Sequence, residues 1–180
     1  MSLPWGGSAG IVLMAPVATV AGAAAAAAAG ARLADAGRDG ELVPAIRRAV
    51  GGVLVCGEHE TAGVVRDPGL AARTGAALIC PGPDAADAAV RRGVAAERIL
   101  VQAVPAGIEP AVQAGWAVLA DLEAEDAAGR VRTEAVAAIC AWLGASVLRT
   151  RYVAEVRRCA DMTESILGRR PPAWAVRGLA

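Results

Sequence analysis

The sequence predicts an α/β protein, a compressed (β/α)8 barrel of the TIM type that leaves room for one degraded unit. Two observations predict this fold. Short apolar runs rich in β-branched residues recur along the chain, and a glycine precedes each of them. These glycines lie 21, 24, 18, 22 and 29 residues apart, at Gly30, Gly51, Gly75, Gly93, Gly115 and Gly144. Strand and helix units of about 20–25 residues are typical of a parallel sheet with right-handed crossovers.

Each apolar run is short and continuous, as in a parallel strand that is buried on both faces. The preceding glycine is the left-handed residue that ends a helix before the chain turns into a strand. Seven strands are predicted in this way, at residues 11–14, 32–35, 53–56, 77–80, 98–101, 116–119 and 146–149. The widest gap, around Asp121 to Arg132, is predicted to hold a degraded helix and the eighth strand. An open doubly wound sheet is the alternative, because barrels usually need about 200 residues or more.

Helices are predicted between the strands, among them Thr133–Leu143 and Val153–Leu167. The chain opens with an apolar run whose first charged residue is Arg32. Proline and glycine interrupt this run, and its second half is mostly alanine, a helix former but a weak membrane anchor. The run therefore predicts a buried strand and a helix rather than a membrane span. The length predicts a single domain over residues 1–180.

The composition excludes several function classes. All 18 basic residues are arginine, they balance 18 acidic residues, and the chain contains no Lys, Asn or Phe. Without Lys there is no Schiff base, no pyridoxal-phosphate anchor and no P-loop lysine, and the sequence requires no cofactor. Balanced charge argues against nucleic-acid binding. Four cysteines without a CxxC pair indicate free thiols in a reducing cytoplasm.

Four segments, taken in order, carry a resemblance to a known family. Residues 22–37 (GAAAAAAAGARLADAG) include Asp35, and residues 41–47 (ELVPAIR), 94–101 (VAAERILV) and 147–167 follow. Each is similar to a helix or strand of the dihydropteroate synthase family, the pterin-binding barrels of folate biosynthesis. The resemblance spans nearly the whole chain and implies a site at the carboxyl ends of the barrel strands. It also implies a transferase that joins a dihydropterin pyrophosphate to 4-aminobenzoate, and Mg²⁺ as a cofactor only by this resemblance.

Several positions depart from the family pattern. The family's Asn after its first strand has no counterpart near Ala15–Val17. The third-strand Asp falls on Glu58, and the next residue is His59 rather than Thr. The Asn of the fourth strand falls near Cys80–Pro81, and the Asp of the fifth falls on Gln102. Because a buried polar group without a partner costs about 1–3 kcal/mol, these losses predict weakened pterin recognition.

The last two strands depart further. The family's Ser-Arg-Lys segment becomes Asp121-Leu122-Glu123, and of the terminal Arg-x-His-Asp only Arg149 remains. We therefore expect a catalytically degenerate paralogue, a pseudoenzyme that binds a small ligand or acts as a partner subunit, with no residue predicted to be catalytic and no metal site. An active pterin-dependent transferase is the alternative. The expected ligand is small and anionic or pterin-like, and it is predicted to contact Asp35, Glu58, His59, Gln102, Asp121, Arg149 and Arg151.

Two segments leave alternatives open. Cys56–Glu60 holds the only His between two carboxylates, and it is either a metal or thiol site or a polar strand end with buried thiols. Arg149 and Arg151 are two residues apart, so both side chains can point to the barrel mouth as an anion site. A surface arginine pair is the alternative. If Arg149 points inward it must be paired, because an isolated buried charge is very costly.

The resemblance also implies a homodimer through the last two helices. Trp142, Val156 and Met162 are predicted to contribute to this face or to the intramolecular core. An acidic stretch is predicted to be a solvated loop, with members Glu109, Asp121, Glu123, Glu125 and Asp126. Residues 169–174 are predicted to form an extended tail that docks on the domain or binds a partner.

Overall fold

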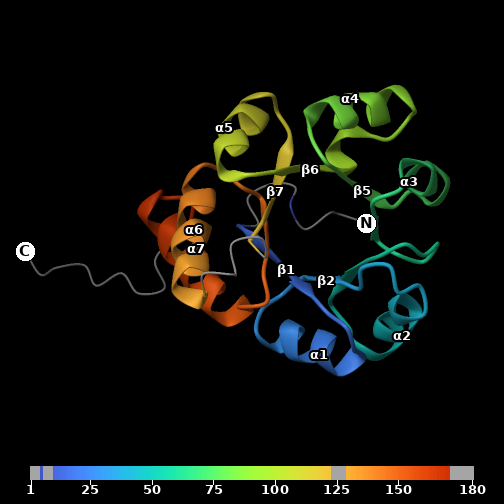
Figure 1. Ribbon diagram of the computed structural model, residues 1–180, viewed down its shortest axis with the longest axis horizontal. Coiled ribbons are helices and arrows are strands. Elements are labelled where there is room, and N and C mark those ends of the chain that lie inside the picture. The colour runs from blue at the N-terminus through green and yellow to red at the C-terminus, as the bar shows by residue number, and fades with distance from the viewer. Residues whose placement is uncertain (1–4, 6–9, 123–128, 171–180) are drawn as a thin grey trace, which may run out of the picture.

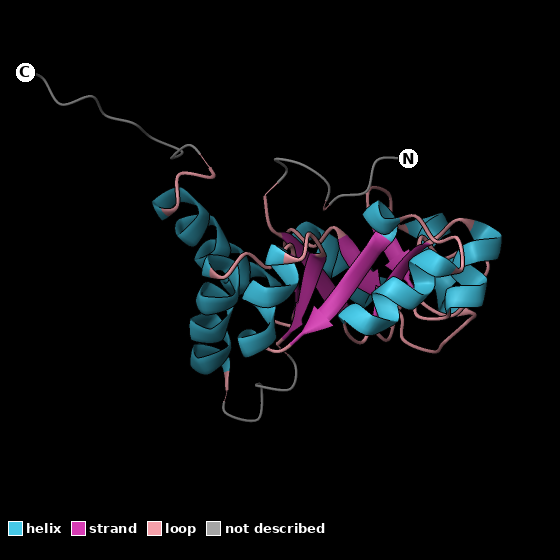
Figure 2. Cartoon of the chain, turned by 90° about the horizontal axis from the view of Figure 1, so that it is seen from above, coloured by secondary structure: helices cyan, strands magenta, loops and turns pink. Residues whose placement is uncertain are grey.

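The computed structural model describes Trp5, residues 10–122 and residues 129–170. Within these residues, eight parallel strands close a barrel, and seven α-helices surround it (Figure 1). Figure 2 shows the strands at the centre of the molecule with helices on either side of them. The predicted (β/α)8 barrel is confirmed, and the open-sheet alternative is wrong, because β8 pairs with β1 through Val12 and Val147.

The strands follow one another around the barrel in chain order. Every neighbouring pair is parallel, so all eight carboxyl ends lie at one end of the barrel, which we call the mouth. The strands are β1 Val12–Pro16, β2 Leu33–Asp35, β3 Leu54–Cys56, β4 Val64–Val65, β5 Ala77–Cys80, β6 Ile99–Ala103, β7 Ala117–Asp121 and β8 Val147–Arg149.

The helices begin and end where local sequence signals place them. Asp67 caps the first turn of one helix, and three helices begin with proline, where the missing N–H costs nothing. Gly75 ends a helix at φ +67°, a left-handed conformation that favours glycine. The helices are α1 Val20–Ala28, α2 Leu42–Ala49, α3 Pro68–Thr74, α4 Pro83–Arg91, α5 Pro105–Gln113, α6 Arg130–Trp142 and α7 Val153–Ile166.

Two separate apolar clusters hold the barrel together. One lies between the strands and the helices, where buried alanines of the helices allow close approach to the sheet. The other fills the barrel interior, with Trp5 at the amino end and side chains such as Met14, Leu33, Leu119 and Val147 above it. Successive side chains of a strand point to opposite faces of the sheet, so the residue two positions after each interior side chain also faces inward. This alternation decides which side chains enter the mouth.

The eighth strand is not where the sequence predicted it. It is β4, Val64–Val65, between β3 and β5. A strand of two residues is too short to show a periodic pattern, and only seven residues, 57–63, separate it from β3 without an intervening helix. The degraded unit is therefore the third one. In the segment Asp121 to Arg132, β7 ends and α6 begins, and residues 123–128 lie outside the described residues.

The other sequence predictions have mixed outcomes. The three helices predicted at 41–47, 133–143 and 153–167 correspond to α2, α6 and α7. Glu109 lies in α5 rather than in a loop, and the acidic residues at 123, 125 and 126 lie outside the described part, as do residues 171–174 of the tail. A helix long and apolar enough to cross a membrane is absent from the described residues.

Candidate functional site

Four charged side chains meet at the barrel mouth. Asp35 ends β2 and accepts hydrogen bonds from Arg66 and Arg149, with Arg66 Nη2 and Arg149 Nε lying 2.9 and 2.8 Å from its Oδ2. Arg149 Nη1 also lies 3.1 Å from Oδ1 of Asp121, the last residue of β7. Asp35 is almost fully buried, with 1% of its side chain exposed. We call Asp35, Arg66, Asp121 and Arg149 the mouth network.

The strand pattern explains why these side chains converge. Leu33, Leu119 and Val147 face the barrel interior, and two residues later on each strand stand Asp35, Asp121 and Arg149. Each polar group is thus the next inward position after an apolar one, at the end where the strand opens to solvent. The charges lie directly above the apolar interior.

Electrostatics keep Asp35 ionised. Burial raises the pKa of this carboxyl, but hydrogen bonds and charge from Arg66 and then Arg149 outweigh burial and hold the pKa below the ordinary value of 3.8. The N–H of Gly37 donates a further hydrogen bond to its Oδ1, at 3.1 Å. A carboxylate with a lowered pKa and three donors is poorly suited to carry a proton at neutral pH. Asp35 therefore organises the mouth rather than supplying a general acid or base.

Cys56 lies beside this network at the end of β3. Its side chain is fully buried, and Arg66 Nη1 lies 3.5 Å from its Sγ. Burial, followed by the negative charge of Asp35, raises the pKa of the Cys56 thiol to about 12. The thiol is therefore protonated at neutral pH, which argues against the activated-thiol interpretation. In the part of the chain that the structure describes, no three His, Cys, Asp or Glu residues gather as metal ligands would.

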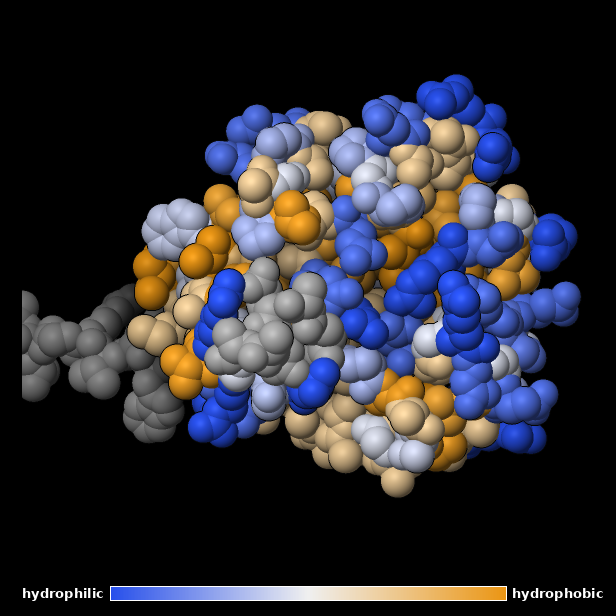
Figure 3. All heavy atoms as spheres, viewed as in Figure 1, coloured by the Kyte–Doolittle hydropathy of each residue, from blue (hydrophilic) through white to orange (hydrophobic). Residues whose placement is uncertain are grey.

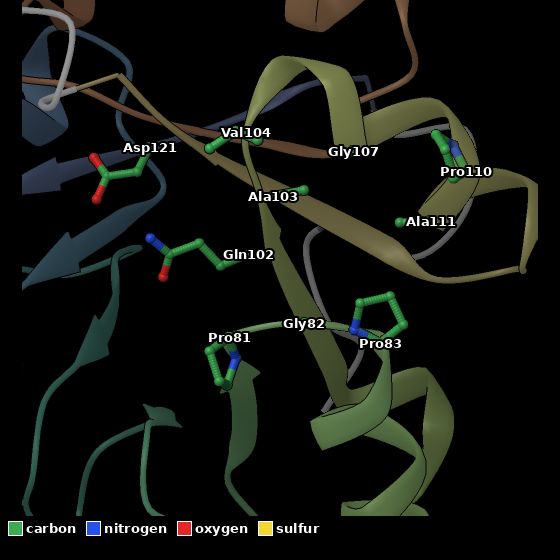
Figure 4. Close-up of a pocket in the computed structure, with 10 residues that line it drawn as sticks. All are labelled: Pro81, Gly82, Pro83, Gln102, Ala103, Val104, Gly107, Pro110, Ala111 and Asp121. Atoms are coloured by element: carbon green, nitrogen blue, oxygen red, sulfur yellow. The ribbon is translucent and has the colours of Figure 1, made fainter.

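An apolar pocket opens next to the network, over the ends of β5, β6 and β7. Its volume is about 620 Å³. Gln102 and Asp121 come from the neighbouring strands β6 and β7, and Figure 4 shows both side chains extending to the same side of the pocket. Backbone and apolar groups form the remaining wall, from Pro81, Gly82, Pro83, Ala103, Val104, Gly107, Pro110 and Ala111. We call this the mouth pocket.

The structure brings together only some of the predicted site residues. Asp35, Asp121 and Arg149 form the mouth network, and Gln102 lines the adjoining pocket. Glu58 and His59 follow β3 but join neither feature. Glu58 is exposed, and Nδ1 of His59 lies 2.9 Å from the Thr61 hydroxyl within its own loop.

Arg151 is exposed and takes no part in the bonds between Arg149 and the two mouth carboxylates. Because β8 ends at Arg149, strand alternation does not by itself extend to Arg151, and the expectation that Arg151 joins Arg149 at the mouth stays a prediction. The inward-pointing Arg149 is paired with two carboxylates, as its burial requires.

Sequence reasoning missed Arg66, which directly follows β4. The residue was overlooked because the two-residue strand before it was not recognised. A signal was present, because Val64-Val65 is a β-branched pair and Asp67-Pro68 is a helix start, so the residue between them stands where a strand meets its helix.

The predicted dimer residues separate into two groups. Val156 is fully buried in the core between α7 and the barrel, so it cannot contribute to an interface. Trp142 and Met162 are exposed, together with Ile139 of α6 and Ile166 of α7. Figure 3 shows apolar residues in orange on the left of the molecule, over these two helices.

The chain is similar to solved structures over most of its length. It superposes on the structure of Mycobacterium tuberculosis Rv1207 with a TM-score of 0.77 and 27% identity, covering 96% of this chain and 100% of that one. For the Yersinia pestis dihydropteroate synthase the TM-score is 0.70 at 15% identity, covering 89% of this chain and 94% of that one. For the Xanthomonas albilineans dihydropteroate synthase with 4-aminobenzoic acid, the TM-score is 0.74 at 16% identity, covering 89% of this chain and 94% of that one. The last two likenesses show the fold.

Curated relatives match part of the chain. "Inactive dihydropteroate synthase 2" of Mycobacterium tuberculosis is 35% identical over 121 residues, which cover 53% of this chain. The protein of the same name from Mycobacterium leprae is 35% identical over 83 residues, which cover 41% of this chain. The matches span 37% and 28% of the relatives' own lengths. No family model matches the chain. In sequence and in barrel topology, the chain is a short homologue of the dihydropteroate synthases.

Proposed function

We propose that this protein is a catalytically degenerate dihydropteroate synthase-like barrel that binds a small anionic or heterocyclic, pterin-like ligand at its mouth without turning it over. The observation that carries the proposal is the mouth network. Its two arginines are already engaged by Asp35 and Asp121. The relatives named inactive dihydropteroate synthase 2 support the same conclusion.

The mouth network argues against the transferase reaction, because its cations are already engaged by carboxylates. Expulsion of pyrophosphate needs cations that are aimed at the leaving group as its negative charge develops. Arg66 and Arg149 donate to carboxylates instead, and rotating either one away would break ion pairs with the buried Asp35. The chain has no Lys to replace them. The Mg²⁺ that the family resemblance implies is usually held by one or two carboxylates and the substrate phosphates, and the mouth carboxylates Asp35 and Asp121 are already paired with arginines.

The mouth pocket supports ligand binding. Its volume of about 620 Å³ lies within the range of about 300–1,000 Å³ that is usual for small-molecule sites. An apolar wall can take the face of a planar ring, while the Gln102 amide and the Asp121 carboxylate offer a donor and acceptors to its edge. A pterin presents such an edge. An active transferase of the same family remains the enzymatic alternative.

Calorimetry with a dihydropterin pyrophosphate, with and without 4-aminobenzoate, tests this function. We expect binding and no release of pyrophosphate. Gln102→Ala should weaken binding about tenfold, because one hydrogen bond to a charged or polar ring edge is lost. Glu58→Ala should leave the affinity unchanged, since Glu58 lies outside the pocket. Turnover would overturn the degenerate assignment, and absence of binding would leave only a partner role.

A homodimer through α6 and α7 is the second part of the proposal. It is favoured by the exposed Ile139, Trp142, Met162 and Ile166, which are 53%, 56%, 68% and 65% exposed. Clustered exposed apolar residues on adjacent helices mark interaction surfaces. Sedimentation of Trp142→Glu should show a shift to monomer, whereas Val90→Glu on the distant α4 should not. A wild-type monomer at all concentrations would remove this part of the proposal.

Three further expectations belong to the same proposal. Residues 1–180 form a single domain, the protein resides in the cytoplasm, and it does not bind nucleic acid. The balanced charge of 18 basic and 18 acidic residues supports the last expectation, because nucleic-acid binding usually needs an excess of basic residues.

A further inference from the structure

A second cleft lies at the other end of the barrel from the mouth. It has a volume of about 290 Å³ and opens where β3, β4 and β5 begin. Its walls include Arg47 at the end of α2, Leu54, Thr61, Gly63, Gly75 at the end of α3, and Arg98 just before β6. We call this the amino-end cleft. None of these residues contributes to the mouth network or the mouth pocket.

The degraded third unit creates this cleft. Residues 57–63 connect β3 to β4 without a helix, so α2 and α3 flank a stretch of barrel wall that a helix would otherwise cover (Figure 1). Gly63 lets the connection pass close to β3, because a Cβ at this position would collide with Leu54. The amino-end cleft is therefore a direct consequence of the shortened unit.

Two guanidinium groups lie in the cleft with hydrogen-bonding capacity to spare. Nε of Arg98 is buried and has no hydrogen-bond partner. Its Nη1 lies over Gly75, 3.2 Å from where a Cβ would stand, so a larger residue there would displace it. Arg47 donates from Nη1 to the carbonyl of Thr61, which uses one of its five N–H groups.

No carboxylate neutralises these arginines in the described part of the chain. Neither Arg47 nor Arg98 has an ion pair there, and Glu60, which also lines the cleft, is exposed and unpaired. An unpaired donor in a buried position costs free energy unless a ligand or water satisfies it. Nε of Arg98 itself is closed to solvent, so an acceptor supplied from outside would meet the terminal N–H groups of the two arginines, of which only one, on Arg47, has a hydrogen-bond partner among the described residues.

We propose that the amino-end cleft binds a small phosphate-type oxyanion between Arg47 and Arg98. Guanidinium groups match the paired oxygens of phosphate, and charge-assisted hydrogen bonds of this type are among the strongest in proteins. The space accommodates inorganic phosphate and the phosphate group of a small phosphomonoester. This site is independent of ligand binding at the mouth.

Calorimetry with inorganic phosphate at constant ionic strength tests the proposal. Arg47→Gln and Arg98→Gln should each weaken binding about tenfold or more, because each removes charge-assisted hydrogen bonds. Arg48→Gln is the matched control, since Arg48 is the next residue of α2, is exposed and does not line the cleft. Arg149→Gln, which removes a cation from the mouth, should leave phosphate affinity unchanged. A parallel titration with phenyl phosphate separates the two sources: tighter binding than phosphate identifies a phosphomonoester site, and weaker binding identifies a site for the free anion.

Amide NMR keeps the result interpretable if Arg98→Gln fails to fold. Phosphate should then shift the amide signals of Thr61, Gly63 and Gly75 in the wild type and shift them much less in Arg47→Gln, whose side chain is exposed. Equal phosphate affinity in the wild type and Arg47→Gln would overturn the site. Loss of phosphate binding in Arg149→Gln but not in Arg47→Gln would also overturn it, because the anion would then be bound at the mouth.

Discussion

The two ends of the barrel each contain a pair of arginines, in opposite electrostatic situations. At the mouth, Arg66 and Arg149 share the buried Asp35, and Arg149 also binds Asp121. At the amino end, Arg47 and Arg98 have no ion pair among the described residues, and a buried Nε of Arg98 has no hydrogen-bond partner. The same residue type is thus neutralised within the protein at one end and left with unused donors at the other.

This difference separates structural charge from charge that is available to a ligand. At the mouth of a barrel, where catalysis is usual, the arginines are engaged in holding the carboxylates. At the amino end, where side chains usually serve stability, Arg47 and Arg98 line a cleft and form no ion pair with any described residue, Glu60 included. The end of the barrel at which an arginine lies therefore does not by itself show whether it can bind an anion. Its ion-pair and hydrogen-bond partners within the protein decide that.

The largest expected effect comes from Asp35, which joins both mouth arginines. Asp35→Ala should lower the free energy of unfolding by about 2–3 kcal/mol, because it removes the carboxylate that two partly buried arginines share. Urea unfolding measures this loss. Asp87→Ala, on the exposed face of α4, is the control and should change stability by less than about 0.5 kcal/mol. A loss at Asp35 as small as that of the control would mean that the network does not stabilise the fold.

The next effect concerns the coupling between the two mouth arginines. Arg149→Gln should cost about 2 kcal/mol, and Arg66→Gln less, since Arg149 is 20% exposed with two carboxylate partners and Arg66 is 36% exposed with one. The double variant should lose more than the sum of the single losses, because only then is Asp35 left without a cation. Additive losses in a double-mutant cycle would show that Asp35 does not couple them.

The network also predicts a dependence on pH. The folded-state pKa of Asp35 lies below its ordinary value of 3.8, so the unfolded chain binds a proton at higher pH than the native protein. Its stabilising contribution is complete above the ordinary value and is lost as pH falls toward the folded pKa. One group changes stability by at most about 1.4 kcal/mol per pH unit. The difference in unfolding free energy between wild type and Asp35→Asn, measured across this acid range, should shrink as pH falls; a constant difference would contradict the lowered pKa.

The smallest expected effect sharpens the contrast between the two ends. In phosphate-free buffer, Arg47→Gln should change stability by less than about 0.5 kcal/mol, because the side chain is exposed and has no ion pair with any described residue to lose. Thermal unfolding of this variant beside Arg149→Gln gives the comparison directly. If Arg47→Gln were as destabilising as Arg149→Gln, the cleft arginine would have a structural role that its contacts do not reveal.

Much of the fold could be predicted because its signals are local. Glycine-punctuated apolar runs predicted seven of the eight strands to within a few residues, α6 and α7 were predicted from their own segments, and α2 was predicted from the family resemblance. The eighth strand could not be found in this way, because Val64 and Val65 are too few to form a pattern. They are a strand only because β3 and β5 lie on either side and supply the hydrogen-bond partners.

The candidate site was predictable only in part, for a related reason. Asp35, Asp121 and Arg149 end strands with apolar interior positions two residues earlier, so alternation alone points them into the mouth. Glu58 and His59 were predicted by alignment to a family pattern, but β3 ends at Cys56 and the chain then leaves the barrel wall. Arg66 was not predicted, because the short strand β4 that directly precedes it was not predicted either.

The sequence by itself determined the alternation of strands and helices, the polar strand ends, and the absence of Lys and Asn, which no fold can restore. Tertiary structure alone decided which charges meet, because the ion pairs of Asp35 reach 31 and 114 residues along the chain. It also decided that the third unit lacks its helix and leaves the amino-end cleft open. The physical reason is that periodicity and turn chemistry act between near neighbours, whereas the pairing of charges depends on the closure of the barrel.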